Sequence, residues 1–418
     1  MSTESRLAEP ALTHSGEWLT VPGCKRILVV AHSTTYAKQL RYTLPLLESD
    51  LRTQTVFTVA PHPFGEGVVP YLRAMGISTI PWQQALGMEF DLALAAGSRG
   101  IHEVRAPIIR MPHGAGHIKL ARGVDAQSSA RNGNRRAAAM LNRSHLMHEG
   151  KVVPAAIALP HARDLDTLAW SCPEALSRAT VVGDPAYDCM LASLPHRAAY
   201  RQALGVEEGQ RLLLLSSTWG RSASFGRLDA LLPRLLSELP RDRHVIAVLV
   251  HPNVSAGHGA HQVRSWLAGY LRQGVAVAPP TTDWPALLAA ADVFLGDHGS
   301  LSAYAALAGV PILLIAHPEH EVDPDSPAAA LARRAPHLVP AVPLATQLEH
   351  AEESFTPDAY REVSALLSSE PGRFPRLMRS LMYRMLGLSE PAYPPVMGPA
   401  PLPPPLTSWI FTGREYPR

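Results

Sequence analysis

Residues 292–315 read Asp292-Val-Phe-Leu-Gly-Asp-His-Gly-Ser-Leu-Ser-Ala-Tyr-Ala-Ala-Leu-Ala-Gly-Val-Pro-Ile-Leu-Leu-Ile315. The first apolar run is short, as in a buried parallel strand, and Gly299 and Ser300 then open an alanine-rich helix that ends at Gly309-Val-Pro311. Strand, turn and helix in this order place free backbone N–H groups and the positive end of a helix dipole at the turn, where a phosphate can bind. The alternative is that Asp297 and Ser300 only cap the helix.

Composition excludes several classes of protein. The chain has 418 residues, 46% hydrophobic and 18% charged, which is enough for two globular domains, and its formal net charge of +2 is too small to indicate nucleic acid. Three distant cysteines, Cys24, Cys172 and Cys189, suggest neither a disulfide framework nor a zinc site, as expected in a reducing cytosol. Because no apolar leader or run of about 20 apolar residues occurs, we expect a cytoplasmic protein, at most peripheral at the inner face of a membrane.

Short apolar runs alternate with helix-length segments twice along the chain, which is the pattern of doubly wound parallel sheets. The predicted strands are Arg26–Ala31, Thr55–Val59, Ile77–Ile80, Phe90–Ala95 and Ile108–Ile109 in the first half, and Leu212–Ser216, Val245–Val250, Val275–Val277, Val293–Leu295 and Ile312–Ile315 in the second. We therefore predict an α/β fold with two Rossmann-like domains that face one interdomain cleft.

Polar residues follow two strands of the second half. Ser216-Ser-Thr-Trp-Gly-Arg221 comes after the first strand and His251-Pro-Asn253 after the second, so both lie at carboxyl ends of strands, where ligands of open α/β sheets bind. Taken singly, Thr218 can be a helix cap and His251 can hydrogen-bond its own turn. Their coincidence with Ser300 at one edge of one sheet favours a shared ligand.

The opposite wall of the cleft is predicted from the first half. Arg110-Met-Pro-His-Gly-Ala-Gly-His-Ile-Lys119 follows a predicted strand, and Gly114 and Gly116 allow the backbone conformations of a loop that approaches a substrate. His113 can take a proton from an attacking hydroxyl, and Lys119 can hold an anion. A glycine turn with a surface histidine and lysine is the alternative.

Five blocks of the sequence resemble, in order, motifs of the CDP-glycerol glycerophosphotransferase family, which builds teichoic-acid-type polymers. The segment 112–119 resembles its His-Gly-Thr-Pro-x-Lys motif. The other matches are Gly183-Asp-Pro-Ala-Tyr-Asp188 with Gly-x-Pro-Arg-x-Asp, Leu215-Ser-Ser-Thr-Trp-Gly-Arg221 with Pro-Thr-Trp-Arg, His251-Pro252 with His-Pro, and Leu295-Gly-Asp-His-Gly-Ser300 with Thr-Asp-Tyr-Ser-Ser. Together they span about half of the chain.

The resemblance implies a GT-B fold and a transferase that acts in cell-envelope or polymer biosynthesis. It would move a glycerol-phosphate-like or glycosyl group from a nucleotide-diphosphate donor, CDP-glycerol or a nucleotide sugar, to a hydroxyl of a polyol, glycan or lipid-linked acceptor. His113 would be the catalytic base. The acceptor side would comprise Gly114, Gly116 and Lys119, and the donor diphosphate would meet Thr218, Arg221, His251, Asp297, His298, Gly299 and Ser300. No cofactor, metal or nucleic acid is expected.

Departures from the family motifs leave the substrate open. Pro112 replaces the usual tryptophan, Ala115-Gly116 replaces Thr-Pro, Ala186 replaces the arginine, and His298-Gly299 replaces Tyr-Ser. The alternatives are a UDP-sugar glycosyltransferase, an enzyme similar to UDP-N-acetylglucosamine 2-epimerase, and a nucleotide-binding regulatory protein without turnover. A P-loop GTPase is excluded because the sequence has no G-x-x-x-x-G-K-[ST] motif.

The remaining motifs favour structural interpretations. The segment His317–Asp323 contains side chains that can bind a metal, but Pro318 interrupts the helix that a His-x-x-x-His metal site would need, so we expect a loop there. Glu321 or Asp323 is a candidate for a ribose contact. A basic stretch, with members Arg131, Arg135, Arg136, Arg143 and Lys151, is expected to be a solvated helical face, with contact to an anionic acceptor or membrane as the alternative.

The predicted boundaries follow from these patterns. They are a flexible N-terminus at 1–22, an acceptor-side domain at 23–190, a donor domain at 191–355, closing helices at 356–388 that pack back across the junction, and a proline-rich, extended or disordered tail at 389–418.

Overall fold

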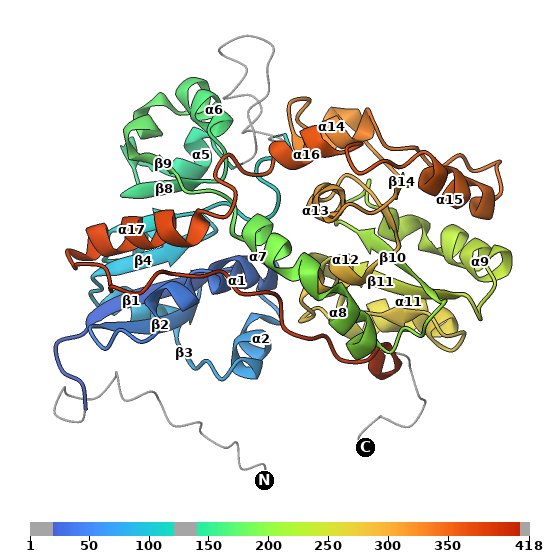
Figure 1. Cartoon of the computed structure of the whole chain (residues 1–418). Coiled ribbons are helices and arrows are strands. Elements are labelled where there is room, and N and C mark those ends of the chain that lie inside the picture. Colours follow the sequence, from blue (N-terminus) through green and yellow to red (C-terminus); the bar gives the residue numbers. More distant parts are fainter. Residues whose placement is uncertain (1–19, 121–139, 410–418) are drawn as a thin grey trace.

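The structure is a computed structural model and describes residues 20–120 and 140–409 (Figure 1). Two parallel sheets dominate it. The first has the strand order β3-β2-β1-β4-β5-β8-β9 and the second β12-β11-β10-β13-β14. Their strands are β1 (Lys25–Ala31), β2 (Thr53–Val59), β3 (Thr79–Ile80), β4 (Leu92–Ala95), β5 (Ile108–Arg110), β8 (Ala156–Leu159), β9 (Ala179–Val181), β10 (Arg211–Ser217), β11 (His244–Val250), β12 (Ala276–Val277), β13 (Val293–Gly296) and β14 (Ile312–Leu314). A small antiparallel hairpin joins β6 (Met147–His148) to β7 (Lys151–Val152).

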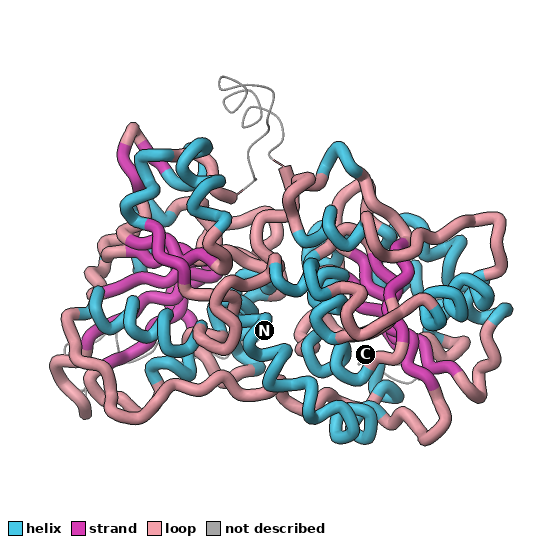
Figure 2. Tube along the Cα trace, turned by 45° about the horizontal axis from the view of Figure 1, so that its top comes forward, coloured by secondary structure: helices cyan, strands magenta, loops and turns pink. Residues whose placement is uncertain are grey.

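Helices surround each sheet, and Figure 2 shows two bodies, each with strands at its centre, that are joined by helices and loops between them. The first body has α1 (Thr34–Arg41), α2 (Val68–Ala74), α3 (Trp82–Gly87), α5 (Arg143–Leu146) and α6 (Arg163–Ser171). The second has α9 (Leu228–Glu238), α10 (Pro252–His258), α11 (Ala260–Leu271), α12 (Trp284–Ala290), α13 (Ser300–Ala308), α14 (Pro327–Ala332) and α15 (Leu344–Glu353). Short 3-10 turns are η3 (Leu44–Leu47), η4 (Ile101–Glu103), η6 (Pro173–Arg178), η8 (Ser224–Arg227) and η9 (Glu319–Glu321).

Burial on both faces explains why the strands read as continuous apolar runs. Ile27, Leu28, Val29 and Val30 of β1 expose at most 2% of their surface. In each sheet the strand order reverses beside the first strand, between β1 and β4 or between β10 and β13. Ligands of such folds bind outside the carboxyl ends of the strands at this point, so the topology alone indicates one binding edge for each sheet.

The predicted strands occur in the structure with differences at their ends, and the short strands β6, β7, β8 and β9 were not predicted. β3, β4, β12 and β14 are shorter than predicted, and the helical stretch after β1 divides into α1 and η3. Of the strands that were not predicted, β8 and β9 belong to the first sheet. Both are short: the runs that form them, Ala156-Ile-Ala-Leu159 and Ala179-Thr-Val181, have only four and three residues, too few for a periodicity argument to detect.

Besides the proline-rich tail, two segments of the chain cross between the two bodies. The first crossing is made by α7 (Pro185–Ser193), η7 (Leu194–His196) and α8 (Arg197–Leu204), which lie between the sheets in Figure 1. Later, α16 (Arg361–Ala365) packs on α13 and α14 of the second body, whereas α17 (Phe374–Leu386) packs on β4, η3 and α7. Asp188 of α7 fixes this return, because its carboxylate accepts hydrogen bonds from the backbone N–H groups of Gly372 (2.7 Å) and Phe374 (2.9 Å).

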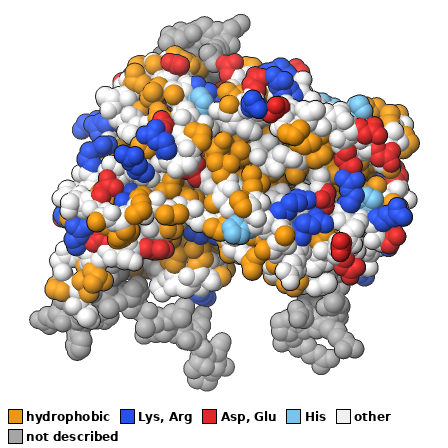
Figure 3. Space-filling view, in the orientation of Figure 1, with side chains coloured by type: hydrophobic (Ala, Val, Ile, Leu, Met, Phe, Trp, Pro, Cys, Tyr) orange, Lys and Arg blue, Asp and Glu red, His pale blue; other side chains and the backbone are white. Residues whose placement is uncertain are grey.

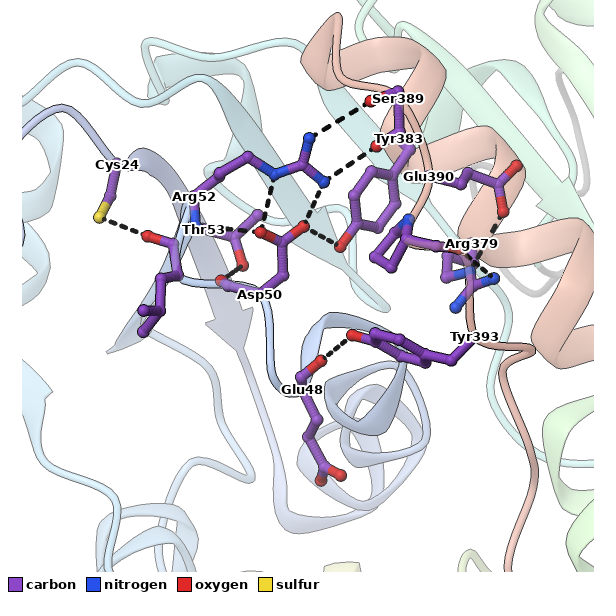
Figure 4. A network of polar contacts seen from close by, with 12 residues as sticks. Cys24, Glu48, Asp50, Arg52, Thr53, Arg379, Tyr383, Ser389, Glu390 and Tyr393 are labelled. Carbon is purple, nitrogen blue, oxygen red and sulfur yellow. Dashed lines mark hydrogen bonds and ion pairs between the residues drawn. The ribbon is translucent and has the colours of Figure 1, made fainter.

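The proline-rich tail is extended as predicted, but the prediction of disorder is wrong for residues 389–409. After α17 the tail runs along the first body, where Arg52 donates to the carbonyl of Ser389 (3.0 Å) and the Tyr393 hydroxyl donates to the carbonyl of Glu48 (Figure 4). Tyr383 of α17 donates to Asp50 in the same network (2.8 Å). Prolines have no backbone N–H and cannot form the hydrogen-bond ladder of a β-strand. Hydrogen bonds from side chains to single backbone carbonyls hold this segment instead.

The tail then reaches the second body. The Ala400 amide donates to Ser193 Oγ (2.9 Å), the Tyr200 hydroxyl donates to the Ala400 carbonyl (2.7 Å), and η10 (Leu406–Trp409) packs near β12. Trp409 is 6% exposed. Apolar side chains gather across the middle of this face of the molecule (Figure 3). The tail therefore connects both bodies. The free energy gained by burying its apolar side chains offsets the conformational entropy that the tail loses when it is ordered.

Three predictions concern residues outside the described parts of the chain. They are the flexible N-terminus up to residue 19, the basic residues Arg131, Arg135 and Arg136, and the end of the tail after residue 409. The boundaries proposed for the domains stay predictions. Among the described residues, no helix combines the length and the apolar character that crossing a membrane requires.

Candidate functional site

A cavity of about 470 Å³ lies between the two bodies. Its walls are the loops at the carboxyl ends of β5 on one side and of β10, β11 and β13 on the other, together with α1 and the start of α12. Both binding edges indicated by the sheet topology thus open into one interdomain cleft. Its volume lies in the range typical of small-molecule sites.

The turn between β13 and α13 is held open by Asp297. This carboxylate is 2% exposed and accepts hydrogen bonds from the backbone N–H groups of Thr218 (3.0 Å), Ser224 (2.9 Å) and Gly299 (3.0 Å). Because its carboxylate oxygens accept these backbone hydrogen bonds within the protein, Asp297 shapes the turn. Gly299 is the N-cap residue and forms no side-chain cap, so the first N–H groups of α13 remain available at the cavity.

His251 caps its own turn and faces the cavity at the same time. Its Nδ1 accepts a hydrogen bond from the Asn253 amide (3.1 Å), which places the proton of the neutral imidazole on Nε2. Burial, and then the positive charge of Lys119, lower its pKa to about 3. The two sequence interpretations of His251 are therefore compatible, because one ring nitrogen serves the turn and the other can donate to a ligand.

His113 and Gly114 face Ser300 across the cleft. A Cβ atom added to Gly114, whose φ is +71°, would lie only 2.4 Å from Ser300 Oγ, so the two loops are in contact. The ring of Tyr36 packs 4.3 Å from that of His113 and fixes its position. Burial first, and then the charges of Arg110 and Lys119, lower the pKa of His113 to about 3. Its Nδ1 has no hydrogen-bond partner among the described residues.

Lys119 joins the two walls. Its Nζ donates to the carbonyl of Trp219 (3.2 Å) and lies 4.7 Å from the centre of the Trp219 indole. Beside it, the Leu120 amide donates to the carbonyl of Glu321 (3.0 Å) and the Asp323 amide donates to that of Ile118 (2.8 Å). The loop after β5 thus pairs with the segment after β14.

Most of the predicted site residues line the cavity, and three do not. His113, Gly114, Gly116, Lys119, Thr218, His251, Asp297, His298, Gly299 and Ser300 line it. Arg221 is exposed, and neither Glu321 nor Asp323 is among the lining residues. Glu321 accepts instead from the Ser222 hydroxyl (2.7 Å), and an Asp323 carboxylate oxygen accepts from the Asp325 amide (3.1 Å). The structure therefore does not bring these three residues to the cavity with the others.

Sequence reasoning missed several residues of the first-body wall. His117 lines the cavity and is 6% exposed, and Arg110, the last residue of β5, is 1% exposed. Lys38 and Arg41 of α1 were also missed. Lys38 Nζ donates to the carbonyl of Thr282 (2.7 Å) and Arg41 pairs with Asp283 (2.8 Å), so both link the two bodies at the cavity. Burial, opposed by the charge of Asp283, lowers the pKa of Lys38 to about 8.

The structure describes the segment 317–323 and two members of the basic stretch, Arg143 and Lys151. The segment 317–323 is a loop with the short turn η9, and no group of three or more metal-capable side chains occurs in residues 20–120 and 140–409. Of the basic stretch, Arg143 begins α5 and pairs with Glu174 (2.7 Å), and the side chain of Lys151 in β7 is exposed. Neither residue belongs to the cavity lining.

Known proteins resemble the chain in structure but not detectably in sequence. No protein-family model matches it, and no curated protein matches its sequence. The wall teichoic acid polymerase TagF aligns with a TM-score of 0.58 and 12% identity over 87% of this chain and 89% of the TagF chain. MnaA of S. aureus, solved with UDP, aligns with a TM-score of 0.53 and 14% identity over 88% of this chain and 99% of that one. The chain therefore has a GT-B-like fold of two Rossmann-like domains, which it shares with TagF and MnaA.

Proposed function

We propose that the protein is a transferase that binds a nucleotide-diphosphate donor at Gly299 and Ser300 and activates an acceptor hydroxyl with His113. The observation that carries this proposal is the contact of Gly114 with Ser300, which sets a histidine opposite a helix N-terminus inside one cavity. Backbone N–H groups and the dipole of α13 suit a diphosphate. The Nε2–H of His251 supplies a further neutral donor at that wall.

The chemistry follows from these positions. In transfer of a glycerol phosphate, the acceptor oxygen forms a bond to the distal phosphorus, the bond from that phosphorus to the bridging oxygen breaks, and a nucleoside monophosphate leaves. The acceptor proton passes to His113. Positioning and charge stabilisation are the main requirements of this reaction. His113 is neutral in the free protein, and the negative charge of a bound diphosphate raises its pKa toward the range of an effective base.

CDP-glycerol is the donor that the sequence motifs favour, and the resemblance to TagF, one structure of which was obtained with CDPG, supports it. A UDP-sugar is the alternative, since MnaA was solved with UDP on the same fold. The two donors differ in the leaving group. Glycosyl transfer breaks the bond from the sugar to the diphosphate and releases a nucleoside diphosphate.

A thermal-shift panel tests the proposal. It comprises CDP-glycerol, CDP-ribitol, UDP-sugars, GDP-sugars and GTP, and a ligand at 100 times its dissociation constant adds about 2.7 kcal/mol to the free energy of unfolding. We expect CDP-glycerol to stabilise the wild type and not Ser300→Asp, which places a charge and added bulk at the turn. Ser237→Asp, the same change at an exposed position of α9, is the control. Equal stabilisation of all three proteins would show that the donor site is misplaced.

A further inference from the structure

A buried cation, Arg110, lies at the end of β5, just before the loop that carries His113 and His117, and the proposed mechanism has no use for it. Its Nε donates to Ser98 Oγ (2.9 Å), in the loop after β4. Its side chain is 1% exposed, and no carboxylate of the described residues forms an ion pair with it. Leaving a guanidinium buried without an anion is costly, so such groups are normally paired.

His117 follows Arg110 in the loop after β5 and, unlike Arg110, lines the cavity. It is 6% exposed and has no hydrogen-bond partner for either ring nitrogen among the described residues. Both Arg110 and His117 are thus buried. Burial, and then the charge of Arg110, lower the pKa of His117 to about 3. Most buried polar groups in proteins are satisfied, so an imidazole with two unsatisfied nitrogens beside a cavity indicates that a ligand supplies the partner.

The group is separate from the donor site. The residues proposed for the donor diphosphate come from the second body, whereas Arg110 and His117 come from the strand and loop of β5. A neutral imidazole always has one N–H to donate, and the guanidinium of Arg110 adds a positive field in a poorly solvated place. Both features favour an oxyanion.

We propose that His117 and Arg110 form a second anion subsite, which binds a phosphate or carboxylate group of the acceptor substrate. This assignment rests on the proposed function, in that it names the chemical class of the second substrate of the same cleft. His117 contacts the anion, and Arg110 acts through its charge. The acceptor is thus an anionic hydroxyl compound, held with its hydroxyl toward His113.

The test is a calorimetric titration of inorganic phosphate into the full chain saturated with CDP, which occupies the donor site. We expect phosphate to bind, and His117→Phe and Arg110→Gln each to weaken phosphate binding at least about tenfold. The first variant loses a hydrogen bond to a charged group, and the second loses the positive charge that favours the anion. Affinity for CDP should stay within about twofold. His102→Phe and Arg105→Gln make the same changes at exposed positions of the same body and should behave as the wild type. Titration of acetate in parallel distinguishes a preference for phosphate from one for carboxylate.

Two results would overturn the subsite: phosphate affinity of a folded His117→Phe equal to that of the wild type, or no binding of phosphate or acetate to the CDP-loaded protein. His117→Gln keeps one N–H donor and should recover part of the affinity, which a merely structural role would not predict. If CDP itself does not bind, the proposed function fails. The subsite is then tested by titrating phosphate into the free chain, where loss of binding in His117→Phe but not in Ser300→Asp would support it, and unchanged binding in both would reject it.

Discussion

At the scale of single residues, the cleft is built around four imidazoles that burial keeps neutral. Desolvation lowers the pKa of His113, His117 and His251 to about 3 and that of His298 to about 4. A neutral imidazole can donate from one nitrogen and accept at the other, so it can serve a diphosphate or a proton transfer without adding charge. The different surroundings of these histidines decide their proposed roles.

His113 and His251 should differ in the kinetic constant that they affect. Because a base acts on the acceptor proton in the transition state, we expect His113→Ala to lower kcat by about 10²–10⁴-fold with little change in donor affinity. His251→Ala should mainly weaken donor binding. Steady-state kinetics and donor titrations separate the two effects, with His102→Ala as the control for loss of an exposed imidazole. Equal turnover of His113→Ala and the wild type would remove the proposed base.

The buried histidines also predict how stability depends on pH. Their pKa values lie near 6.5 in the unfolded chain and at about 3 to 4 in the folded protein, so the unfolded state binds more protons in this window. Their contribution to the free energy of unfolding is present above pH 6.5 and decreases as the pH falls toward 3. Burial raises the pKa of Asp184 to about 7, which acts in the opposite direction.

The variant His117→Phe separates the contribution of one buried histidine to the pH dependence of stability from the opposite contribution of Asp184. His117→Phe removes one of the depressed imidazoles, so its free energy of unfolding should fall less between pH 6.5 and 4 than that of the wild type. Urea denaturation at several pH values measures both curves. Parallel curves would show that His117 does not titrate on unfolding.

Residue-level prediction from the sequence succeeded where a motif marks a strand end and failed where burial decides. Ser300, His251 and His113 follow predicted strands, and all three line the cavity. His117 lies in the same quoted segment, but its proposed role rests on its burial and on its two unsatisfied ring nitrogens, neither of which has a sequence signal. Arg221 shows the reverse error, because belonging to a motif did not bring it to the cavity.

At the scale of elements, the site depends on two loops that approach unusually closely. Gly114 and Gly116 both have positive φ, at +71° and +67°, but only a Cβ on Gly114 would meet Ser300; that on Gly116 comes no closer than 3.9 Å to Pro160. Alanine at either position adds a backbone cost of about 1–2 kcal/mol. Only Gly114→Ala also pushes the two walls of the cleft apart.

We therefore expect Gly114→Ala to weaken donor binding more than Gly116→Ala does, although the backbone penalty is similar. Adding Ser300→Gly to Gly114→Ala should remove the steric part of the loss. Donor titrations of the three variants measure the difference. Equal affinities in the two alanine variants would mean that contact between these loops has no role in binding.

Element prediction was reliable for the long, fully apolar strands and for α13 and α17. Gly309 ends α13 in the left-handed conformation, as the sequence pattern indicates, and Gly387 ends α17 in the same way. β8 and β9 escaped prediction because they add to an edge of the sheet already formed by β5. Pairing with a neighbouring strand, rather than local propensity, decides such segments.

At the scale of the whole molecule, the tail holds the two bodies in place together with α7 and α17. Buried Ala400, Leu406 and Trp409 anchor it, and a large apolar side chain contributes about 1.5–3 kcal/mol when fully buried. The sequence favoured an extended or disordered tail because prolines form no ladder. The anchoring contacts are distant in sequence, such as Ser193 with Ala400, and local patterns do not reveal them.

Truncation after Leu388 should consequently destabilise the protein, whereas removal of a dispensable tail would leave the free energy of unfolding unchanged. We expect a loss of several kcal/mol in the free energy of unfolding, on the order of the burial of two large side chains. Truncation after Trp409 retains every described contact of the tail and is the control. Chemical denaturation compares the two proteins with the full chain, and equal stability of all three would show that the tail contributes nothing.

The location of a bound donor tests the central claim most directly, namely that the two bodies form one site around a nucleotide diphosphate. The measurement is a crystal structure of the full chain with CDP-glycerol or CDP. The account predicts the diphosphate within hydrogen-bond distance of the backbone N–H of Ser300 and of His251 Nε2, with His113 on the facing wall. A nucleotide bound elsewhere, or a structure in which His113 and Ser300 lie on separate outer surfaces, would contradict it.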